Sequence, residues 1–256
     1  MYAVFKREFL SYFRNPVGYI AIAVFSFLSG FVFSSQFSQG YINISGEIIS
    51  LRNFFIVIVP IITMGLFADD KKRGTEVIYY TSPITISKVV MGKFLAALSL
   101  FAVMFINVII HMIVTVSVKG KIDAGTIGSI IVFFFLASMF IAIGMLASAI
   151  TDSQVIAAIV TFIAILTVQL IPTIATYASG KIAPSILSLI PGSSIWINDV
   201  CANIGNGIKW LDPFTKILSF RSGVFAIAPL FYLMSVCAIF LFLTYRVLEK
   251  KRWSQS

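Results

Sequence analysis

Charged side chains are scarce in this sequence, at 11% of 256 residues, whereas 59% of the residues are hydrophobic. An average soluble domain carries roughly 25% charged residues, so a water-soluble protein of this length could not cover so much apolar surface. Lipid is the solvent that suits such a composition. Apolar runs extend from one end of the chain to the other, and we predict a single transmembrane domain over 1–256 without a soluble domain.

The residue types that carry catalysis and bind metals are also rare or badly spaced. The chain has two cysteines, Cys201 in a polar segment and Cys237 in an apolar run, and this placement predicts neither a disulfide nor a metal site. A G-x-x-x-x-G-K-[ST] phosphate loop is missing, because Phe94 follows Gly92-Lys93 and no glycine lies five residues before Gly92. The hydrolase motifs H-E-x-x-H and G-x-S-x-G are missing too. We therefore predict that the chain is not an enzyme and holds no cofactor or metal ion itself.

What the sequence does contain is a set of long apolar runs. A membrane-spanning helix needs about 20 apolar residues. Six segments meet this length approximately, although the second is short, and none of them contains Asp, Glu, Lys or Arg. They predict an all-α integral membrane protein with six transmembrane helices, at 17–38, 53–68, 94–118, 127–150, 154–176 and 224–245.

The basic residues indicate an orientation. Most of the 19 Lys and Arg residues lie beside the ends of the spans on one side, and the cytoplasmic loops of membrane proteins carry such an excess. The N- and C-termini are therefore predicted inside, with 246–256 as a basic cytoplasmic tail. Because the basic residues form short runs beside apolar segments, we interpret the net charge of +9 as a topology signal and expect no nucleic-acid partner.

Residues 1–16 form a candidate interfacial helix. At 100° per residue the aromatic side chains fall on one face and Arg7 and Arg14 on the other, a pattern typical of a helix that lies in the lipid headgroup plane. Asn15-Pro16 would end this helix and turn the chain into the first span. A plain cytosolic tail is the alternative. The aromatic face comprises Tyr2, Phe5, Phe9, Tyr12 and Phe13.

The segment 69–93 is the long loop on the inside. Its first four residues are all charged and are expected to be solvated. Thr75 would begin a short helix that Ser82-Pro83 ends, with a second helix after it, and two short helices would make a docking surface. The alternative is a charged turn that only fixes topology, although the segment is longer than a turn requires.

The segment 177–223 is the long loop on the outside. It is rich in Gly, Ser, Pro and Asn but keeps apolar stretches, and Trp196 and Trp210 suit a membrane interface. Short helices that dip partway into the outer leaflet are one interpretation of this pattern. A plain surface loop is the other, and the pattern alone leaves both open.

The polar residues inside the predicted spans include no Asp, Glu, Lys or Arg. Asn107 and His111 are four residues apart in the third span and therefore share a helix face, and Gln169 lies in the fifth. These side chains could line a pathway or join helices by hydrogen bonds, and for His111 the second role is favoured. Ion-coupled carriers commonly place carboxylates at membrane depth, and the predicted spans contain none. This pattern disfavours such a carrier and favours an amphiphilic or apolar substrate that moves with energy from elsewhere.

Several motifs resemble those of ABC-2 type transporter permeases. The first inside loop carries Asp70-Lys71-Lys72-Arg73-Gly74-Thr75-Glu76, Thr81-Ser82-Pro83 and Gly92-Lys93-Phe94. The two ends of the chain carry Lys6-Arg7-Glu8, Asn15-Pro16-Val17-Gly18-Tyr19, Asp212-Pro213-Phe214 and Arg246-Val247-Leu248-Glu249. The resemblance covers essentially the whole chain and is greatest to the permeases of gliding-motility and nitrous-oxide-reductase maturation transporters.

The resemblance implies a six-span half-transporter in a bacterial plasma membrane. Two such subunits, identical or paired with a sister permease, would enclose one pathway above two cytosolic ABC ATPase subunits that hold ATP and Mg²⁺. In that family the N-terminal helix and a coupling helix in the first loop contact the ATPase, and short outer helices precede the last span. The residues that match the coupling positions are Arg73, Gly74, Thr75, Glu76, Ser82 and Pro83, and more loosely Lys6, Arg7 and Glu8.

Functions from different classes remain open at this point. The leading one is the permease subunit of an ATP-driven exporter. The alternative is a membrane scaffold or mechanotransmitter that couples the ATPase to an extracytoplasmic accessory protein without passing a substrate. A membrane-embedded enzyme would need clustered reactive side chains in the spans, where only Asn107 and His111 are found.

Overall fold

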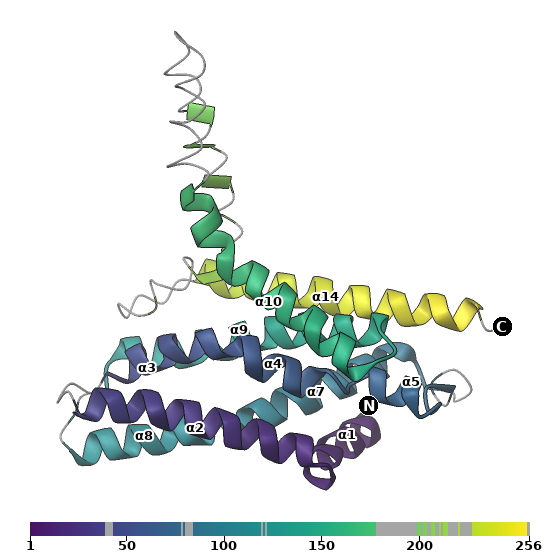
Figure 1. Cartoon of the computed structure of the whole chain (residues 1–256), viewed down its shortest axis with the longest axis horizontal. Coiled ribbons are helices and arrows are strands. Elements are labelled where there is room, and N and C mark those ends of the chain that lie inside the picture. The colour runs from purple at the N-terminus through teal and green to yellow at the C-terminus, as the bar shows by residue number, and fades with distance from the viewer. Residues whose placement is uncertain are drawn as a thin grey trace.

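The computed structural model describes residues 1–38, 43–77, 79, 84–118, 120, 122–177, 199–200, 202–203, 206–207, 210, 212–214, 220 and 227–254. Within these residues the chain is helical and contains no strand (Figure 1). The helices are α1 (Tyr2–Arg14), α2 (Pro16–Ser38), α3 (Ile44–Leu51), the short 3₁₀ helix η1 (Arg52–Phe54), α4 (Phe55–Thr63), α5 (Ala68–Lys72), α7 (Ile86–Met104), α8 (Ile106–Ser117), α9 (Ala124–Ile150), α10 (Gln154–Tyr177) and α14 (Ile227–Ser254).

Six helical segments are long and apolar enough to cross a membrane, which confirms the predicted all-α membrane fold. Four of them are single helices, namely α2, α9, α10 and α14. The second span combines α3, η1, α4 and α5, and the third combines α7 and α8. Both termini lie toward the same end of the bundle in Figure 1, as an even number of crossings requires. We refer to this end as the terminal end.

The prediction of an uncharged second span at 53–68 was wrong. This span runs from Ile44 to Lys72 and therefore contains Glu47 and Arg52. Hydropathy failed here because polar residues are interleaved with the apolar ones before residue 53. Asn43 caps the start of α3 by accepting a hydrogen bond from the Gly46 backbone at 3.1 Å, so the helix begins well before the uniformly apolar stretch.

Two other boundaries also differ from the sequence prediction. The third span begins at Ile86 rather than 94, so it includes Lys93. The last helix continues to Ser254, so most of the predicted tail 246–256 extends α14. Most of the predicted outside loop 177–223, with its short outer helices, lies outside the described residues.

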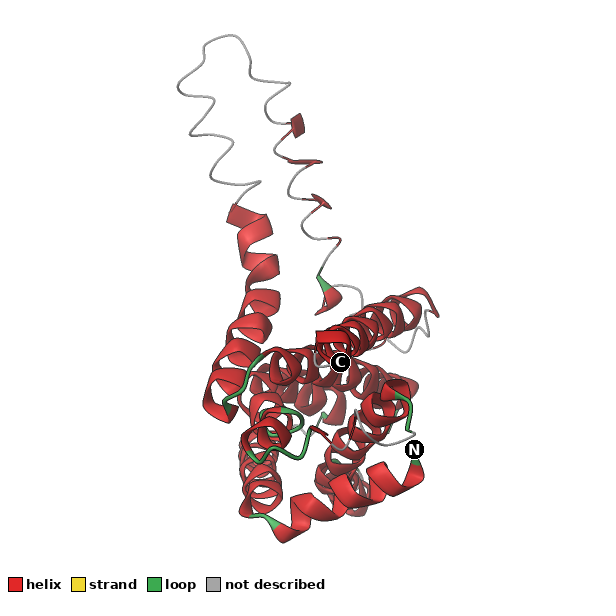
Figure 2. Ribbon diagram, turned by 90° about the vertical axis from the view of Figure 1, so that its right-hand side faces the viewer, coloured by secondary structure: helices red, strands yellow, loops and turns green. Residues whose placement is uncertain are grey.

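Helix α1 lies crosswise to the spans at the terminal end, as Figure 2 shows. It ends at Asn15, whose backbone is extended, and α2 begins at Pro16, as the sequence predicted. Phe5, Phe9 and Phe13 form a row of ring contacts along α1, with centroids 5.8 and 5.2 Å apart. Such a crosswise aromatic helix has the geometry of an interfacial helix, and its position in the headgroup plane stays a prediction.

Helix α9 is the centre of the bundle, since 72% of its apolar window is buried. It packs against α14, α10, α4, α3 and α7. Gly144 permits its closest approach, because a Cβ atom there would lie 2.2 Å from Thr63 Oγ1 of α4. By contrast α10, α2 and α14 bury only 17, 22 and 22% of their windows, so their outer faces are available to lipid or to another subunit.

Candidate functional site

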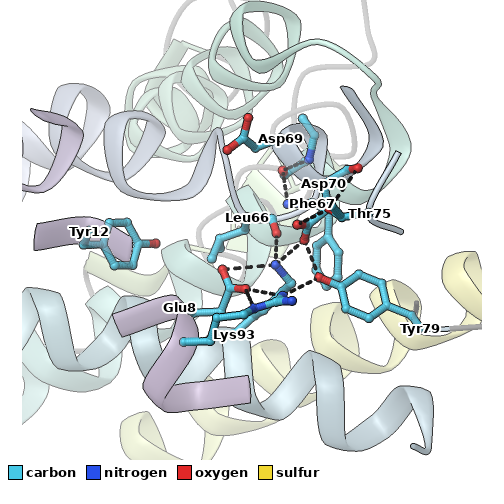
Figure 3. A network of polar contacts seen from close by, with 12 residues as sticks. Glu8, Tyr12, Leu66, Phe67, Asp69, Asp70, Thr75, Tyr79 and Lys93 are labelled. Atoms are coloured by element: carbon cyan, nitrogen blue, oxygen red, sulfur yellow. Dashed lines mark hydrogen bonds and ion pairs between the residues drawn. The ribbon is translucent and has the colours of Figure 1, made fainter. Parts of the chain in front are cut away.

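Lys93 of α7 is the centre of a buried charge network at the terminal end (Figure 3). Its side chain is 1% exposed. Nζ lies 2.5 Å from Asp70 Oδ2 of α5 and 3.1 Å from Glu8 Oε2 of α1, and it donates to the backbone carbonyl of Leu66. A buried ammonium is costly unless its donors are paired, and here each donor has an acceptor.

The Leu66 carbonyl is available because the second span is interrupted there. The chain makes turns from Met64 to Phe67, between α4 and α5, so regular helical hydrogen bonds stop. Ser148 of α9 pairs with the backbone N–H groups that follow the break. Its Oγ accepts hydrogen bonds from the backbone N–H groups of Phe67 and Ala68 at 2.9 and 3.1 Å. The break therefore turns the backbone carbonyl toward Lys93 while α9 supports α5.

Tyr79 and Arg7 extend the network toward the solvent. The Tyr79 hydroxyl donates to Asp70 Oδ2 and accepts from Arg7 at 2.8 Å. Burial raises the pKa of Tyr79 to about 12, so the phenol keeps its proton and remains a donor at neutral pH. Burial acts to lower the pKa of Arg7, but the hydrogen bonds and charge interactions with Glu8 and Tyr79 together outweigh this effect and raise that pKa.

The loop after α5 folds back onto the Asp70 carboxylate. Thr75 Oγ1 donates to Asp70 Oδ1 at 2.9 Å, and the Thr75 backbone N–H donates to the Asp70 carbonyl at 2.9 Å. Gly74 makes this return possible, because its φ of 69° lies in the left-handed region that side-chain-bearing residues rarely adopt. The beginning of the predicted coupling loop is thus a defined turn attached to the network.

Lys71 attaches the same region to the end of α9. Its Nζ donates to the carbonyls of Ala149 and Thr151 at 2.5 and 2.8 Å and lies 3.3 Å from Asp152 Oδ1. Its side chain is only 4% exposed. The expectation that residues 69–72 are all solvated was therefore wrong for Lys71 and for the partly buried Asp70. Both carry a charge that a neighbouring helix satisfies.

The predicted coupling residues divide into three groups. Arg7, Glu8 and Thr75 belong to the network, and Gly74 shapes its turn. Lys6 is exposed, Arg73 is 62% exposed and pairs with Asp69 at 3.1 Å, and Glu76 has one buried oxygen without a hydrogen-bond partner in the described part of the chain. Ser82 and Pro83 lie outside the described residues. Sequence reasoning missed Lys93, Asp70 and Tyr79 as members of the site. We call Arg7, Glu8, Asp70, Tyr79 and Lys93 the Lys93 cluster.

A second buried charge lies toward the opposite end of the bundle. Glu47 of α3 is 0% exposed, and its Oε1 lies 2.6 Å from His111 Nδ1 of α8. Ser29 of α2 donates to the same oxygen at 3.0 Å, and Phe33 stacks on the His111 ring with centroids 4.2 Å apart. Within the described residues, Glu47 Oε2 has no hydrogen-bond partner. The expectation that the spans contain no carboxylate was therefore wrong, because Glu47 lies within the second span. We call Glu47 and His111 the Glu47 pair.

The structure does not bring the other predicted polar residues together. Asn107 donates to Ser26 Oγ at 2.6 Å and to the Met104 carbonyl at 3.2 Å, at the junction of α7 and α8. Gln169 is half-buried and donates to the Asn53 carbonyl at 3.4 Å. Asn107 and His111 both join α8 to α2 or α3, whereas Gln169 lies on a different side of the second span.

The contacts at these two sites join helices to one another. No group of three or more His, Cys, Asp or Glu side chains that could hold a metal ion occurs in the described residues. The Lys93 cluster connects a crosswise peripheral helix, a turn and two membrane spans by ionic contacts. The class of protein that this geometry defines is a multi-pass helical membrane protein whose helices are joined by buried ion pairs at its terminal end.

The sequence matches the family described as ABC-2 family transporter protein over residues 3–253, which is nearly the whole chain. The chain therefore belongs to the ABC-2 transporter family and is a membrane permease subunit of an ABC transporter. The search for similar individual curated proteins returned no match.

Proposed function

We propose that this chain is half of the membrane part of an ATP-driven exporter, and that α1 and the turn after α5 receive the movement of a cytosolic ABC ATPase. A second permease, identical or related, completes the pathway, and ATP and Mg²⁺ bind on the partner ATPase. The observation that carries the proposal is the Lys93 cluster, because it joins α1, α5 and α7 through one buried cation.

The physical reason is rigidity. Helices that share a buried, fully paired charge hold one arrangement, since breaking one partner leaves an uncompensated charge. A push on α1 or on the turn is then transmitted to α7 and to the second span instead of being absorbed locally. Closure of the ATPase pair would rock the two permeases and alternate the access of the pathway.

The ATPase would bind to the exposed groups around this cluster. Arg73 and Lys6 are exposed cations, and Gly74 is exposed at the turn. A cavity of about 210 Å³ lies beside Arg73 and is lined in part by Glu8, Asp69 and Arg73 itself. These groups can form ion pairs and hydrogen bonds with a partner protein. Ser82 and Pro83 stay predicted members of the same surface on the strength of the family resemblance.

The test is a permease with Arg73→Ala and Glu76→Gln, assembled with its ATPase in lipid nanodiscs. We expect substrate-stimulated ATP hydrolysis to be lost while the permease remains folded and membrane-inserted. Lys88→Ala is the matched control, because Lys88 is an exposed cation of α7 outside the cluster. Unchanged substrate-stimulated hydrolysis in the double variant would refute the assignment of the coupling surface.

The orientation and location belong to the same proposal. The N- and C-termini are placed on the cytoplasmic side of a bacterial plasma membrane, which the basic residues beside the span ends favour. Single cysteines at position 6 and at position 250, in a chain lacking its native cysteines, should react with a membrane-impermeant maleimide only after the membrane is opened. Labelling of either position in intact cells would reverse the orientation.

The substrate is proposed to be amphiphilic or apolar, and the nearest subgroup to be the permeases of gliding-motility and nitrous-oxide-reductase maturation transporters. The buried carboxylate of the Glu47 pair removes one argument for this substrate class. The apolar lining of the cavity between α7, α9 and α14 remains in its favour. The second candidate is a scaffold that passes ATPase motion to an extracytoplasmic accessory protein. Substrate movement into vesicles by the purified complex separates the two, since a scaffold would hydrolyse ATP without it.

A further inference from the structure

A groove runs between α7 and α14 on the side of the bundle where both meet α9. Two cavities, of about 420 and 820 Å³, lie along it and share Leu241 as a wall. Helix α14 packs mainly on α9 and touches α7 less, which leaves the space between them open. Volumes of this size fall in the range of ligand-binding sites.

The cavity nearer the middle of the bundle is apolar. Its walls include Phe94 and Leu98 of α7, Phe134 of α9 and Ala238 of α14. The polar groups in its lining already interact with the protein, since Ser138 Oγ donates to the carbonyl of Phe135 at 2.6 Å and Cys237 Sγ donates to that of Ser138 at 3.6 Å. An occupant would therefore gain from burying hydrocarbon there and would find few free hydrogen-bonding groups.

The other cavity opens at the terminal end between polar and charged groups. Thr85, Ser87, Glu249 and Arg252 are among its lining residues. Glu249 is already neutralised, because it accepts hydrogen bonds from Arg246 and from the Tyr245 hydroxyl, both at 2.7 Å. Arg252 is exposed and makes no ion pair within the described residues. The mouth of the groove thus presents an unneutralised cation.

The start of α7 adds to the attraction for an anion. Thr85 is its N-cap, and its side chain makes no capping hydrogen bond. The first backbone N–H groups of a helix lack partners and carry a partial positive charge. A phosphate at this position would meet those N–H groups and the Thr85 hydroxyl on one side and Arg252 on the other.

The length of the groove fits a lipid. Along α14 it extends from Met234 to Arg252. At a rise of 1.5 Å per residue this is about 27 Å. One leaflet with its headgroup region is about 20–22 Å thick. The groove can therefore take a headgroup at its mouth and an acyl chain along its apolar part.

We propose that this groove binds an anionic phospholipid, with its phosphate between Arg252 and the start of α7 and an acyl chain beside Phe94, Leu98 and Ala238. Basic pockets between membrane helices are known to bind anionic headgroups. The assignment to the cytosolic leaflet rests on the orientation proposed above, whereas binding itself does not depend on the ATPase. Because Thr85 lies directly before α7, within the predicted loop 69–93, the lipid would fasten this part of the loop to α14.

The experiment uses the full chain in its native complex, reconstituted in equal amounts of phosphatidylglycerol and phosphatidylcholine and transferred to mild detergent. Native mass spectrometry then gives the ratio of retained anionic to zwitterionic lipid. Arg252→Gln should lower this ratio about fivefold, as expected for one basic residue near an anionic headgroup. Lys250→Gln, an exposed cation of α14 outside the groove, should leave the ratio unchanged.

A second variant tests the acyl-chain part. Ala238→Phe fills the exposed apolar wall and should reduce retention of both lipids, whereas Ile239→Phe, on the neighbouring exposed surface, should not. Retention that is unchanged in both Arg252→Gln and Ala238→Phe would overturn the proposal. Loss of permease dimers in Ala238→Phe with unchanged lipid would assign the groove to the second permease instead. ATPase that dissociates while lipid stays bound would count against the proposed function alone.

Discussion

The Lys93 cluster and the Glu47 pair both bury a charge among helices, but they differ in how completely that charge is met. Lys93 contacts two carboxylates and a backbone carbonyl from separate segments. Glu47 uses one oxygen for His111 and Ser29, while its other oxygen has no hydrogen-bond partner in the described part of the chain. A buried charge that is fully paired favours a single geometry, and one that is half paired can change partner more easily. The arrangement of the Lys93 cluster suits helices that move together as a rigid body. The arrangement of the Glu47 pair suits a place where helices rearrange.

The largest expected effect comes from removing the cation of the fully paired cluster. Lys93→Met leaves the Asp70 carboxylate buried without its cation, while Glu8 keeps only Arg7, so we expect the free energy of unfolding to fall by about 3–5 kcal/mol. Thermal unfolding of the purified chain in detergent measures the loss. Lys88→Met, on an exposed position of the same helix, is the control. Equal melting temperatures for the two variants would mean that the cluster contributes little to the fold.

A smaller loss is expected from the half-paired site. His111→Leu removes one of the two partners of Glu47 Oε1, while Ser29 still donates to that oxygen, so the cost should be about 1–3 kcal/mol. The double variant His111→Leu with Glu47→Leu should recover part of this loss, because no polar group of the pair remains buried. A double variant that is less stable than the sum of the single ones would contradict this account.

Tyr79→Phe tests the outer part of the Lys93 cluster. It removes one hydroxyl that bridges Arg7 and Asp70, and the expected cost is about 0.5–1.5 kcal/mol. Because burial raises the pKa of Tyr79 from 10.0 to about 12, the folded phenol stays neutral where the unfolded one ionises. The contribution is therefore complete below pH 10 and decreases as the pH rises toward 12. The same Tyr79→Phe difference at pH 6 and pH 9 is expected in urea or thermal unfolding.

The smallest effect on stability should come from breaking an exposed ion pair on the surface. Arg73→Ala breaks an exposed pair with Asp69 that is one helical turn away, so the free energy of unfolding should change by less than about 0.5 kcal/mol. Its effect on coupling to the ATPase should nevertheless be large. A stability loss as large as that of Tyr79→Phe would show that Arg73 braces the permease itself rather than contacting a partner.

Sequence reasoning succeeded where the signal is local. Apolar runs in α2, α9 and α10 are continuous, and a helix of that composition is stable in lipid with its own backbone hydrogen bonds. Pro16 ends one helix and begins the next because its ring excludes the preceding helical hydrogen bond. The predicted coupling residues of α1 and of 69–76 also came to the same end of the bundle, since both follow from the topology.

Sequence reasoning failed where the partner of a charged residue lies far away along the chain. Lys93 reads as an interfacial lysine until Glu8 and Asp70 are placed beside it. Glu47 interrupts the hydropathy of its span, and only His111 and Ser29 from two other helices make its burial acceptable. No spacing rule within α3 or α7 connects these residues. Their roles could have been suspected only by asking, for each charged residue near a span, which residue of the chain pairs with it.

The sequence by itself determined that this is a helical membrane protein, that it has six segments apolar enough to span a membrane and that it belongs with transporter permeases, because composition and short motifs are properties of consecutive residues. The tertiary structure alone decided which charges are buried and what they join. Burial of a charge depends on the distance to its counter-charge, and that distance exists only after α1, α5 and α7, or α2, α3 and α8, have packed together.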